Sequence, residues 1–304
     1  MDIPPVVLGC GNFGGIGSAP AFFGQGETRE QAFALMDAAW AMGLDWFDTA
    51  DAYGGGRSEA WIGEWIAATS NRPRITTKTF NPMDAGLDSG LALDRVHRQL
   101  DSSLERLGVD RVDLYLAHEP DPAVPVADTI RAFEEVAEAG KAGAWGLSNY
   151  GAPELQDALA AGRPVLLQNS FSLLFRDDEA EVIPLCSSEG IAYQCFGPLA
   201  GGWLTGKYRA GTSLPEGSRM TLRPEPYVHL DSDDVYRSLD GLEAAAADRC
   251  VSMAGLALAW LLAHPGVTSI VVGPRRPEHL ECVREALALD LGPDERDEVG
   301  SLFT

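Results

Sequence analysis

The sequence predicts an α/β fold, a single (β/α)8 TIM barrel with long loops after strands 1 and 7. Two observations predict this fold. Short apolar runs recur eight times along the 304 residues, and a turn and an amphipathic stretch follow each run. No Ser/Pro-rich stretch and no run of like charge divides the chain, so one domain over 1–304 fits better than two. An open doubly wound sheet is the alternative architecture.

The eight expected strands are too short and too continuously apolar to be half-exposed antiparallel strands. They lie at 6–8, 44–47, 75–79, 114–117, 144–147, 165–168, 192–196 and 270–272. Amphipathic stretches between them predict helices that cover the sheet. These lie at 29–42, 58–68, 91–107, 126–139, 153–161, 180–189, 251–263 and 277–288, with an extra helix at 235–247.

Two segments interrupt the alternation of strands and helices. One is a glycine-rich loop over 9–26, and the other is a long insertion over 197–234. Both follow expected strands, so both belong to the face on which barrel enzymes hold their active sites. The sequence Gly-x-Gly-x-x-Gly at 9–14 satisfies a dinucleotide-binding pattern, but no helix follows it, so we reject a Rossmann site there.

Composition excludes several classes of protein. The formal net charge of −22 opposes binding to nucleic acid or to an anionic membrane surface. Five scattered cysteines without a Cys-x-x-Cys pair argue against a disulfide framework or a zinc site, and reduced thiols fit a cytoplasmic protein. The sequence has no signal-peptide pattern and no apolar run of membrane-spanning length. No His-Glu-x-x-His metal motif occurs, and we expect no metal site.

Four polar residues follow or end consecutive expected strands. Asp48 and Tyr53 come at and after the end of strand 2, Lys78 ends strand 3 and His118 ends strand 4. A tyrosine near pKa 10 transfers protons poorly at neutral pH unless a cation stabilises its phenolate. Lys78 could supply that cation, Asp48 could hold Lys78, and His118 could orient a carbonyl oxygen. Each residue alone is more often structural, but their shared position favours a joint catalytic role.

These residues also carry a family resemblance. Residues 47–54 (Phe-Asp-Thr-Ala-Asp-Ala-Tyr-Gly), Lys78, His118, 146–149 (Gly-Leu-Ser-Asn) and 198–202 (Pro-Leu-Ala-Gly-Gly) resemble the aldo-keto reductase family in order over the whole chain. The resemblance implies that Asp48, Tyr53, Lys78 and His118 form a catalytic tetrad. Tyr53 would be the general acid, Lys78 and Asp48 would tune it, and His118 would orient the carbonyl.

The resemblance further implies NADPH as the cofactor, bound along the carboxyl ends of the strands. Arg275 and Arg276, between the last strand and a helix, are also suited to the 2′-phosphate of NADP from their position alone. The implied cofactor-binding residues are Gly11, Asn12, Phe13, Asp48, Ser148, Asn149, Gln168, Phe196, Gly197, Pro198, Leu199, Gly201, Gly202, Thr205, Lys207, Arg219, Gly273, Arg275, Arg276 and His279. Phe196 stands where the family often has tyrosine. His279, Cys282 and Val283 stand where the family often has residues that hold the adenosine.

The expected activity is NADPH-dependent reduction of a small-molecule aldehyde, ketone or sugar, by reversible hydride transfer. Phe13, Phe22, Phe23, Phe80 and parts of 203–234 are expected to line the substrate pocket. Two alternatives stay open. One is a non-catalytic NADPH-binding regulatory subunit, as in the potassium-channel beta proteins, and the other is a sugar or alcohol dehydrogenase that works oxidatively. The substrate and the oligomeric state do not follow from the sequence.

Overall fold

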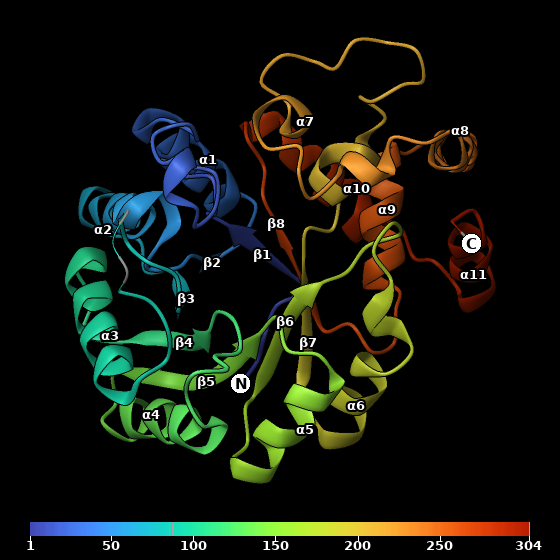
Figure 1. The fold of residues 1–304 in the computed structure, drawn as a ribbon. Coiled ribbons are helices and arrows are strands. Elements are labelled where there is room, and N and C mark those ends of the chain that lie inside the picture. Colours follow the sequence, from blue (N-terminus) through green and yellow to red (C-terminus); the bar gives the residue numbers. More distant parts are fainter. Residues whose placement is uncertain (85, 87, 304) are drawn as a thin grey trace.

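The computed structural model describes residues 1–84, 86 and 88–303, and its central feature is a closed barrel of eight parallel strands (Figure 1). The strands follow one another around the barrel in chain order, which confirms the predicted fold class. Parallel pairing of Val7 with Val271 joins the first strand to the last and closes the barrel. The strands are β1 (Val6–Gly9), β2 (Trp46–Asp48), β3 (Arg74–Thr79), β4 (Val112–Ala117), β5 (Ala142–Ser148), β6 (Leu166–Ser170), β7 (Ala192–Phe196) and β8 (Ser269–Val272).

Helices surround the barrel as an outer ring (Figure 1). Local signals define their ends. Thr28 and Gln31 form a reciprocal capping box at the start of the first helix, and Gly108 ends the third in the left-handed conformation. The ring helices are α1 (Arg29–Ala41), α2 (Arg57–Thr69), α3 (Leu93–Leu107), α4 (Val126–Glu138), α5 (Ala152–Ala161), α6 (Val182–Glu189), α9 (Met253–Leu262) and α10 (Glu281–Ala288).

Among the described residues, three further helices and six short 3-10 helices lie outside this repeat. The expected extra helix is α8 (Asp233–Asp248), while α7 (Arg219–Leu222) and α11 (Pro293–Ser301) are additions to the prediction. The start of α11 has a recognisable sequence signal: Pro293 follows Gly292, and Glu295 comes two residues later. The 3-10 helices are η1 (Pro20–Phe22), η2 (Tyr53–Gly56), η3 (Asp177–Glu179), η4 (Ala200–Thr205), η5 (Val228–Leu230) and η6 (Pro277–Leu280).

Alternation along each strand separates two apolar cores. Successive side chains of a strand point to opposite faces, so Phe47 packs in the layer between strands and helices while Trp46 lies inside the barrel. The inner core contains Val7, Trp46, Leu114, Leu116, Leu166 and Val271. By the same alternation Asp48, two residues after Trp46, also faces the interior, at the carboxyl end of the barrel.

Within the described part of the chain, no single helix is both long and apolar enough to cross a membrane. Only α8 and α9 taken together reach the required length and composition, and they are bent by 88° relative to each other.

Candidate active site

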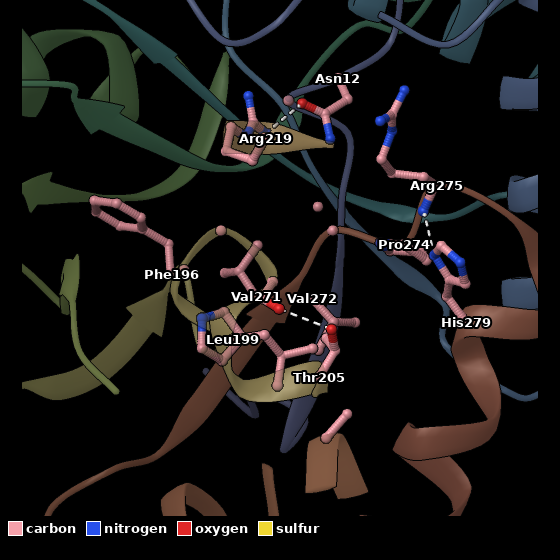
Figure 2. Close-up of a pocket in the computed structure, with 18 of the residues that line it drawn as sticks. Asn12, Phe196, Leu199, Thr205, Arg219, Val271, Val272, Pro274, Arg275 and His279 are labelled. Carbon is pink, nitrogen blue, oxygen red and sulfur yellow. Dashed lines mark hydrogen bonds between the residues drawn. The ribbon is translucent and has the colours of Figure 1, made fainter. Parts of the chain in front are cut away.

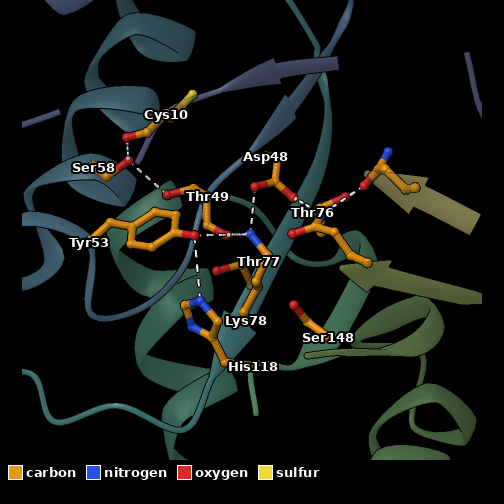
Figure 3. A network of polar contacts seen from close by, with 12 residues as sticks. Cys10, Asp48, Thr49, Tyr53, Ser58, Thr76, Thr77, Lys78, His118 and Ser148 are labelled. Atoms are coloured by element: carbon orange, nitrogen blue, oxygen red, sulfur yellow. Dashed lines mark hydrogen bonds and ion pairs between the residues drawn. The ribbon is translucent and has the colours of Figure 1, made fainter. Parts of the chain in front are cut away.

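The four polar residues predicted from the strand ends lie together at the carboxyl end of the barrel (Figure 3). Lys78 Nζ is 2.5 Å from Asp48 Oδ1 and 3.5 Å from Tyr53 Oη. Tyr53 Oη is in turn 3.5 Å from His118 Nε2. The tyrosine hydroxyl therefore stands between an ammonium and an imidazole.

The turn after β2 places Tyr53 over Lys78. Lys78 also donates to the carbonyl of Thr49 at 2.9 Å, and the backbone N–H of Asp51 donates to the carbonyl of Lys78 at 3.0 Å. Gly54 follows Tyr53 with a φ of 59°, and a Cβ at this position would collide with the backbone of 13–14. Both the left-handed conformation and the close approach require glycine there.

Buried charges set the protonation of the tyrosine and the lysine. Burial disfavours the charged form of Lys78, but Asp48 and Tyr53 outweigh this effect and raise the lysine pKa above its usual value. Burial raises the pKa of Tyr53 above its ordinary value, although the Lys78 charge acts in the opposite direction. Lys78 is therefore a cation and Tyr53 a neutral phenol at neutral pH, which is the state that donates a proton.

His118 is a neutral imidazole at physiological pH. Burial and then the nearby Lys78 charge lower its pKa to about 3. Its Nδ1 atom is buried and has no hydrogen-bond partner among the described atoms. A neutral ring whose Nε2 faces the tyrosine can hold an oxygen by hydrogen bonding, but it cannot serve as an imidazolium acid at neutral pH.

A chain of buried amides continues from Asp48 across the barrel interior. Gln168 Nε2 donates to Asp48 Oδ2 at 2.7 Å and to Gln194 Oε1 at 2.7 Å. Gln194 Nε2 donates to Ser269 Oγ at 3.0 Å. Both donors of Gln168 are thus used within the protein, so its Oε1 is the part of the amide left to accept from a ligand. The prediction missed Gln194 and Ser269; their signal is a polar residue at an inward position of an apolar strand.

A cavity of about 1010 Å³ opens above the tetrad, between the loops that follow β1, β7 and β8 (Figure 2). Most of the predicted site residues line it. Those are Gly11, Asn12, Asp48, Tyr53, Gln168, Phe196, Gly197, Pro198, Leu199, Gly201, Gly202, Thr205, Lys207, Arg219, Gly273, Arg275 and His279. The volume of this cavity suits a ligand larger than a single small carbonyl compound.

Four predicted cofactor residues do not line this cavity. The Phe13 side chain is buried in the apolar core, and Ser148 is buried at the end of β5. The Asn149 amide donates to the carbonyl of His118 at 2.9 Å. Arg276 is exposed at the start of η6. Lys78 and His118 do not line the cavity themselves, but both contact Tyr53, which does.

The aromatic wall differs from the expected one. Phe175 and Tyr227 line the cavity, with ring centroids 6.2 Å apart, whereas Phe13, Phe22, Phe23 and Phe80 do not. The prediction of those four phenylalanines was therefore wrong. Neighbours distant in sequence decide the outcome: the guanidinium of Arg223 lies over the Phe22 ring, and Phe13 packs into the core.

Positive charge collects on the cavity wall of this acidic chain. Burial, followed by the charges of Arg275 and Arg219, lowers the pKa of Lys207 to about 8. Burial, with Arg223 and Arg275 nearby, also lowers the pKa of Arg219. Mutual repulsion of this kind is relieved when an anion binds between the cations. The wall is therefore suited to the phosphates of a dinucleotide.

Arg275 is more constrained than its sequence position indicates. Its Nε donates to Glu27 Oε1 at 2.6 Å, and its Nη1 donates to the carbonyl of Gly217 at 2.5 Å. Glu27 is almost fully buried, and its other carboxylate oxygen has no partner in the described structure. Two of the Arg275 donors are thus engaged with the loops after β1 and β7, which leaves part of the guanidinium for a phosphate.

The comparisons with known proteins agree with this geometry. The model of the aldo/keto reductase family matches residues 5–302. The chain belongs to the aldo/keto reductase family. Members interconvert carbonyl groups and alcohols with NADP(H), so the chain is an NADP-dependent oxidoreductase.

Three relatives represent the aldo/keto reductases that resemble this chain. A rice protein (Oryza sativa subsp. japonica) named "Probable voltage-gated potassium channel subunit beta" is 33% identical over 285 residues, covering 89% of this chain and 85% of the relative. An aryl-alcohol dehydrogenase of Pestalotiopsis microspora is 31% identical over 294 residues, 91% of this chain and 73% of the relative. The crystal structure of a Klebsiella pneumoniae aldo/keto reductase with NADP and acetate is 26% identical, with a TM-score of 0.72 and coverage of 99% and 92%.

The cavity is also lined by the three residues that differ from those with which the family often holds the adenosine. His279, Cys282 and Val283 all line it, and the Cys282 thiol donates to the carbonyl of His279. Burial raises the pKa of this thiol to about 11, so it is protonated. This aldo/keto reductase therefore presents an imidazole, a neutral thiol and an apolar side chain where the family often presents amides and carboxylates.

Proposed function

We propose that this protein reduces an aldehyde or ketone with NADPH, with Tyr53 as the proton donor. The observation that carries the proposal is the position of Tyr53 Oη on the cavity wall, 3.5 Å from both Lys78 Nζ and His118 Nε2. A neutral phenol between a fixed cation and a neutral imidazole is arranged to protonate an oxygen that gains negative charge.

NADPH supplies, when bound, the hydride equivalent that reduces the carbonyl carbon. The protein's own residues manage the oxygen. His118 Nε2, as a neutral N–H donor, holds the carbonyl oxygen next to Tyr53 Oη, and the phenol gives up its proton to that oxygen. Lys78 then stabilises the phenolate, and Asp48 keeps Lys78 charged through the 2.5 Å contact.

Residues of the cavity wall support binding of the cofactor. Lys207 and Arg219 can neutralise phosphate groups, and the backbone at Gly201 and Gly202 allows close approach. Gln168 Oε1 can accept from the nicotinamide amide because its own N–H groups are engaged elsewhere. The Phe196 ring at the end of β7 can stack on the nicotinamide without the hydroxyl of a tyrosine. Ser148 and Asn149, which do not line the cavity, have weaker support.

The first test compares the wild-type protein with Tyr53→Phe on a panel of aromatic aldehydes, methylglyoxal and open-chain sugars. The variant keeps the ring but lacks the proton, so we expect kcat to fall by about 100-fold or more while NADPH still binds. Loss of NADPH absorbance reports turnover, and quenching of protein fluorescence reports binding. Retained activity in Tyr53→Phe would refute the role of the phenol.

The rice relative favours a second candidate, a channel-regulating subunit that binds NADPH without rapid turnover. Tight cofactor binding with no reduction of any panel member would support it. The aryl-alcohol dehydrogenase relative favours the oxidative direction, which faster turnover of alcohols with NADP would support.

We place the protein in the cytoplasm as one domain over 1–304, in keeping with its reduced cysteines.

A further inference from the structure

Most Lys and Arg side chains of this acidic chain have a carboxylate within ion-pair distance. Over residues 1–84, 86 and 88–303, the exceptions are Arg57, Arg72, Arg111, Lys207, Arg219, Arg223 and Arg276. Of these, Arg219 and Arg223 are half-buried. Both line the cavity, where an unpaired guanidinium indicates an anionic ligand.

Two of these cations, Lys207 and Arg219, gather around Arg275. Lys207 and Arg219 lie close to Arg275, whose charge lowers both of their pKa values, and Arg275 contacts His279 beyond β8. This group forms the phosphate side of the cavity in the proposed function. Arg223 also lies near Arg219, but a different part of the chain holds its guanidinium.

Arg223 is attached to the loop that surrounds the catalytic tyrosine. Its Nη1 donates to the carbonyl of Ile16 at 3.3 Å, and its guanidinium lies 5.4 Å from the centre of the Phe22 ring. The same loop approaches Tyr53 closely. The backbone N–H of Gly54 donates to the carbonyl of Gly17 at 3.4 Å. The guanidinium of Arg223 is therefore held beside the Tyr53 end of the cavity.

Apart from the nearby Arg219, the cavity-lining residues that contact Arg223 or lie near it in the chain are apolar or aromatic. Ile16, Leu222, Pro226 and Tyr227 line the cavity together with Arg223. One backbone carbonyl and one aromatic ring fix the guanidinium, and its remaining N–H groups have no protein acceptor in the described structure. A carbonyl compound with a short apolar spacer and a terminal carboxylate or phosphate matches this wall.

We propose that Arg223 forms a subsite for an anionic group of the substrate, so that the enzyme prefers aldehydes and ketones that carry a carboxylate or phosphate. The inference rests on the proposed reductase function and specifies its substrate class. The carbonyl would lie at Tyr53 and His118, and the anion would accept two N–H bonds from Arg223.

The test measures kcat/KM for matched pairs of substrates: succinic semialdehyde against butanal, and glyceraldehyde 3-phosphate against glyceraldehyde. For the wild-type enzyme we expect the anionic member of at least one pair to be favoured. In Arg223→Gln the anionic-to-neutral ratio should fall by about 10- to 100-fold, mainly through KM, because a charge-assisted bond is lost. Arg223→Lys should recover part of the ratio. The pair that responds distinguishes carboxylate from phosphate.

Arg72→Gln is the matched control, because Arg72 is an exposed arginine before β3 that also lacks a carboxylate partner among the described residues. Its ratio should equal that of the wild type. An unchanged ratio in Arg223→Gln would overturn the subsite, and so would an equal loss for both members accompanied by weaker NADPH binding. Turnover of the aldehyde panel without reduction of either anionic compound would also overturn the subsite. If the wild-type enzyme reduces no compound of the panel and no member of either pair, the proposed function itself fails, and this result is distinct from loss of the subsite.

Discussion

At the scale of single residues, the orientation of one buried amide connects the Asp48 carboxylate with the cavity. Gln168 donates to Asp48 and to Gln194, and Gln194 is held by Ser269. Because the Asp48 carboxylate only accepts, Gln168 must present its amino group to Asp48 and its oxygen to the cavity. Gln194 is therefore a positioning residue for Gln168.

Replacing Gln194 tests this role. In Gln194→Leu one Gln168 N–H and the Ser269 hydroxyl lose their partners, and we expect KM for NADPH to rise by about tenfold with a smaller change in kcat. Steady-state kinetics with varied NADPH measures this split. In Ser269→Ala the Gln168–Gln194 bond survives, so KM should change less. A uniform loss of folding stability without any change in KM would contradict a positioning role.

At the scale of structural elements, the turn between β2 and α2 determines where the tyrosine stands. Gly54 adopts a φ of 59° and approaches the backbone of the loop after β1. In Gly54→Ala the left-handed conformation costs about 1–2 kcal/mol, and the new methyl group also collides with Phe13 and Gly14. We expect lower stability and a loss of kcat, because Tyr53 shifts relative to Lys78.

Gly211→Ala separates the two effects. Gly211 has a φ of 68°, but a Cβ there meets no described atom within 4 Å. This variant should lose the conformational contribution alone and keep its activity. Chemical denaturation and steady-state kinetics of both variants provide the comparison. Equal effects would show that close packing around Tyr53 is unimportant.

At the scale of the whole molecule, a buried carboxylate beside the site couples stability to pH. Asp51 is fully buried, accepts from Thr79 Oγ1 at 2.6 Å, and faces Glu59, Arg95 and Arg106. Burial raises its pKa from 3.8 to about 7. The folded protein therefore binds a proton that the unfolded chain has released between these two values, so stability decreases as the pH rises from about 4 to about 7.

Asp51→Asn should remove this dependence. A pKa difference of about three units corresponds to a loss on the order of 4 kcal/mol in the wild type by neutral pH. We expect the difference in unfolding free energy between the variant and the wild type to favour the variant more at about pH 8 than at about pH 5. Denaturant unfolding of both proteins at both pH values measures this difference. The exposed Asp110→Asn is the control and should follow the wild type. Parallel pH curves for Asp51→Asn and the wild type would disprove the assignment.

Sequence reasoning alone predicted the order of the eight strand–helix units and the closeness of Asp48, Tyr53, Lys78 and His118 at one end of the barrel. Both follow from local information, because hydrophobic periodicity marks the elements and parallel strands end on one face. Helix α11 also had a local signal, which the prediction passed over.

Long-range contacts determine which side chains are engaged within the protein and which face the cavity. The tertiary structure pairs Arg275 with Glu27, directs Gln168 by way of Gln194, and brings Phe175 to the wall in place of the expected phenylalanines. It also leaves Arg223 without a carboxylate among the described residues. These outcomes depend on contacts between loops that are far apart in the chain, and no local pattern encodes such contacts.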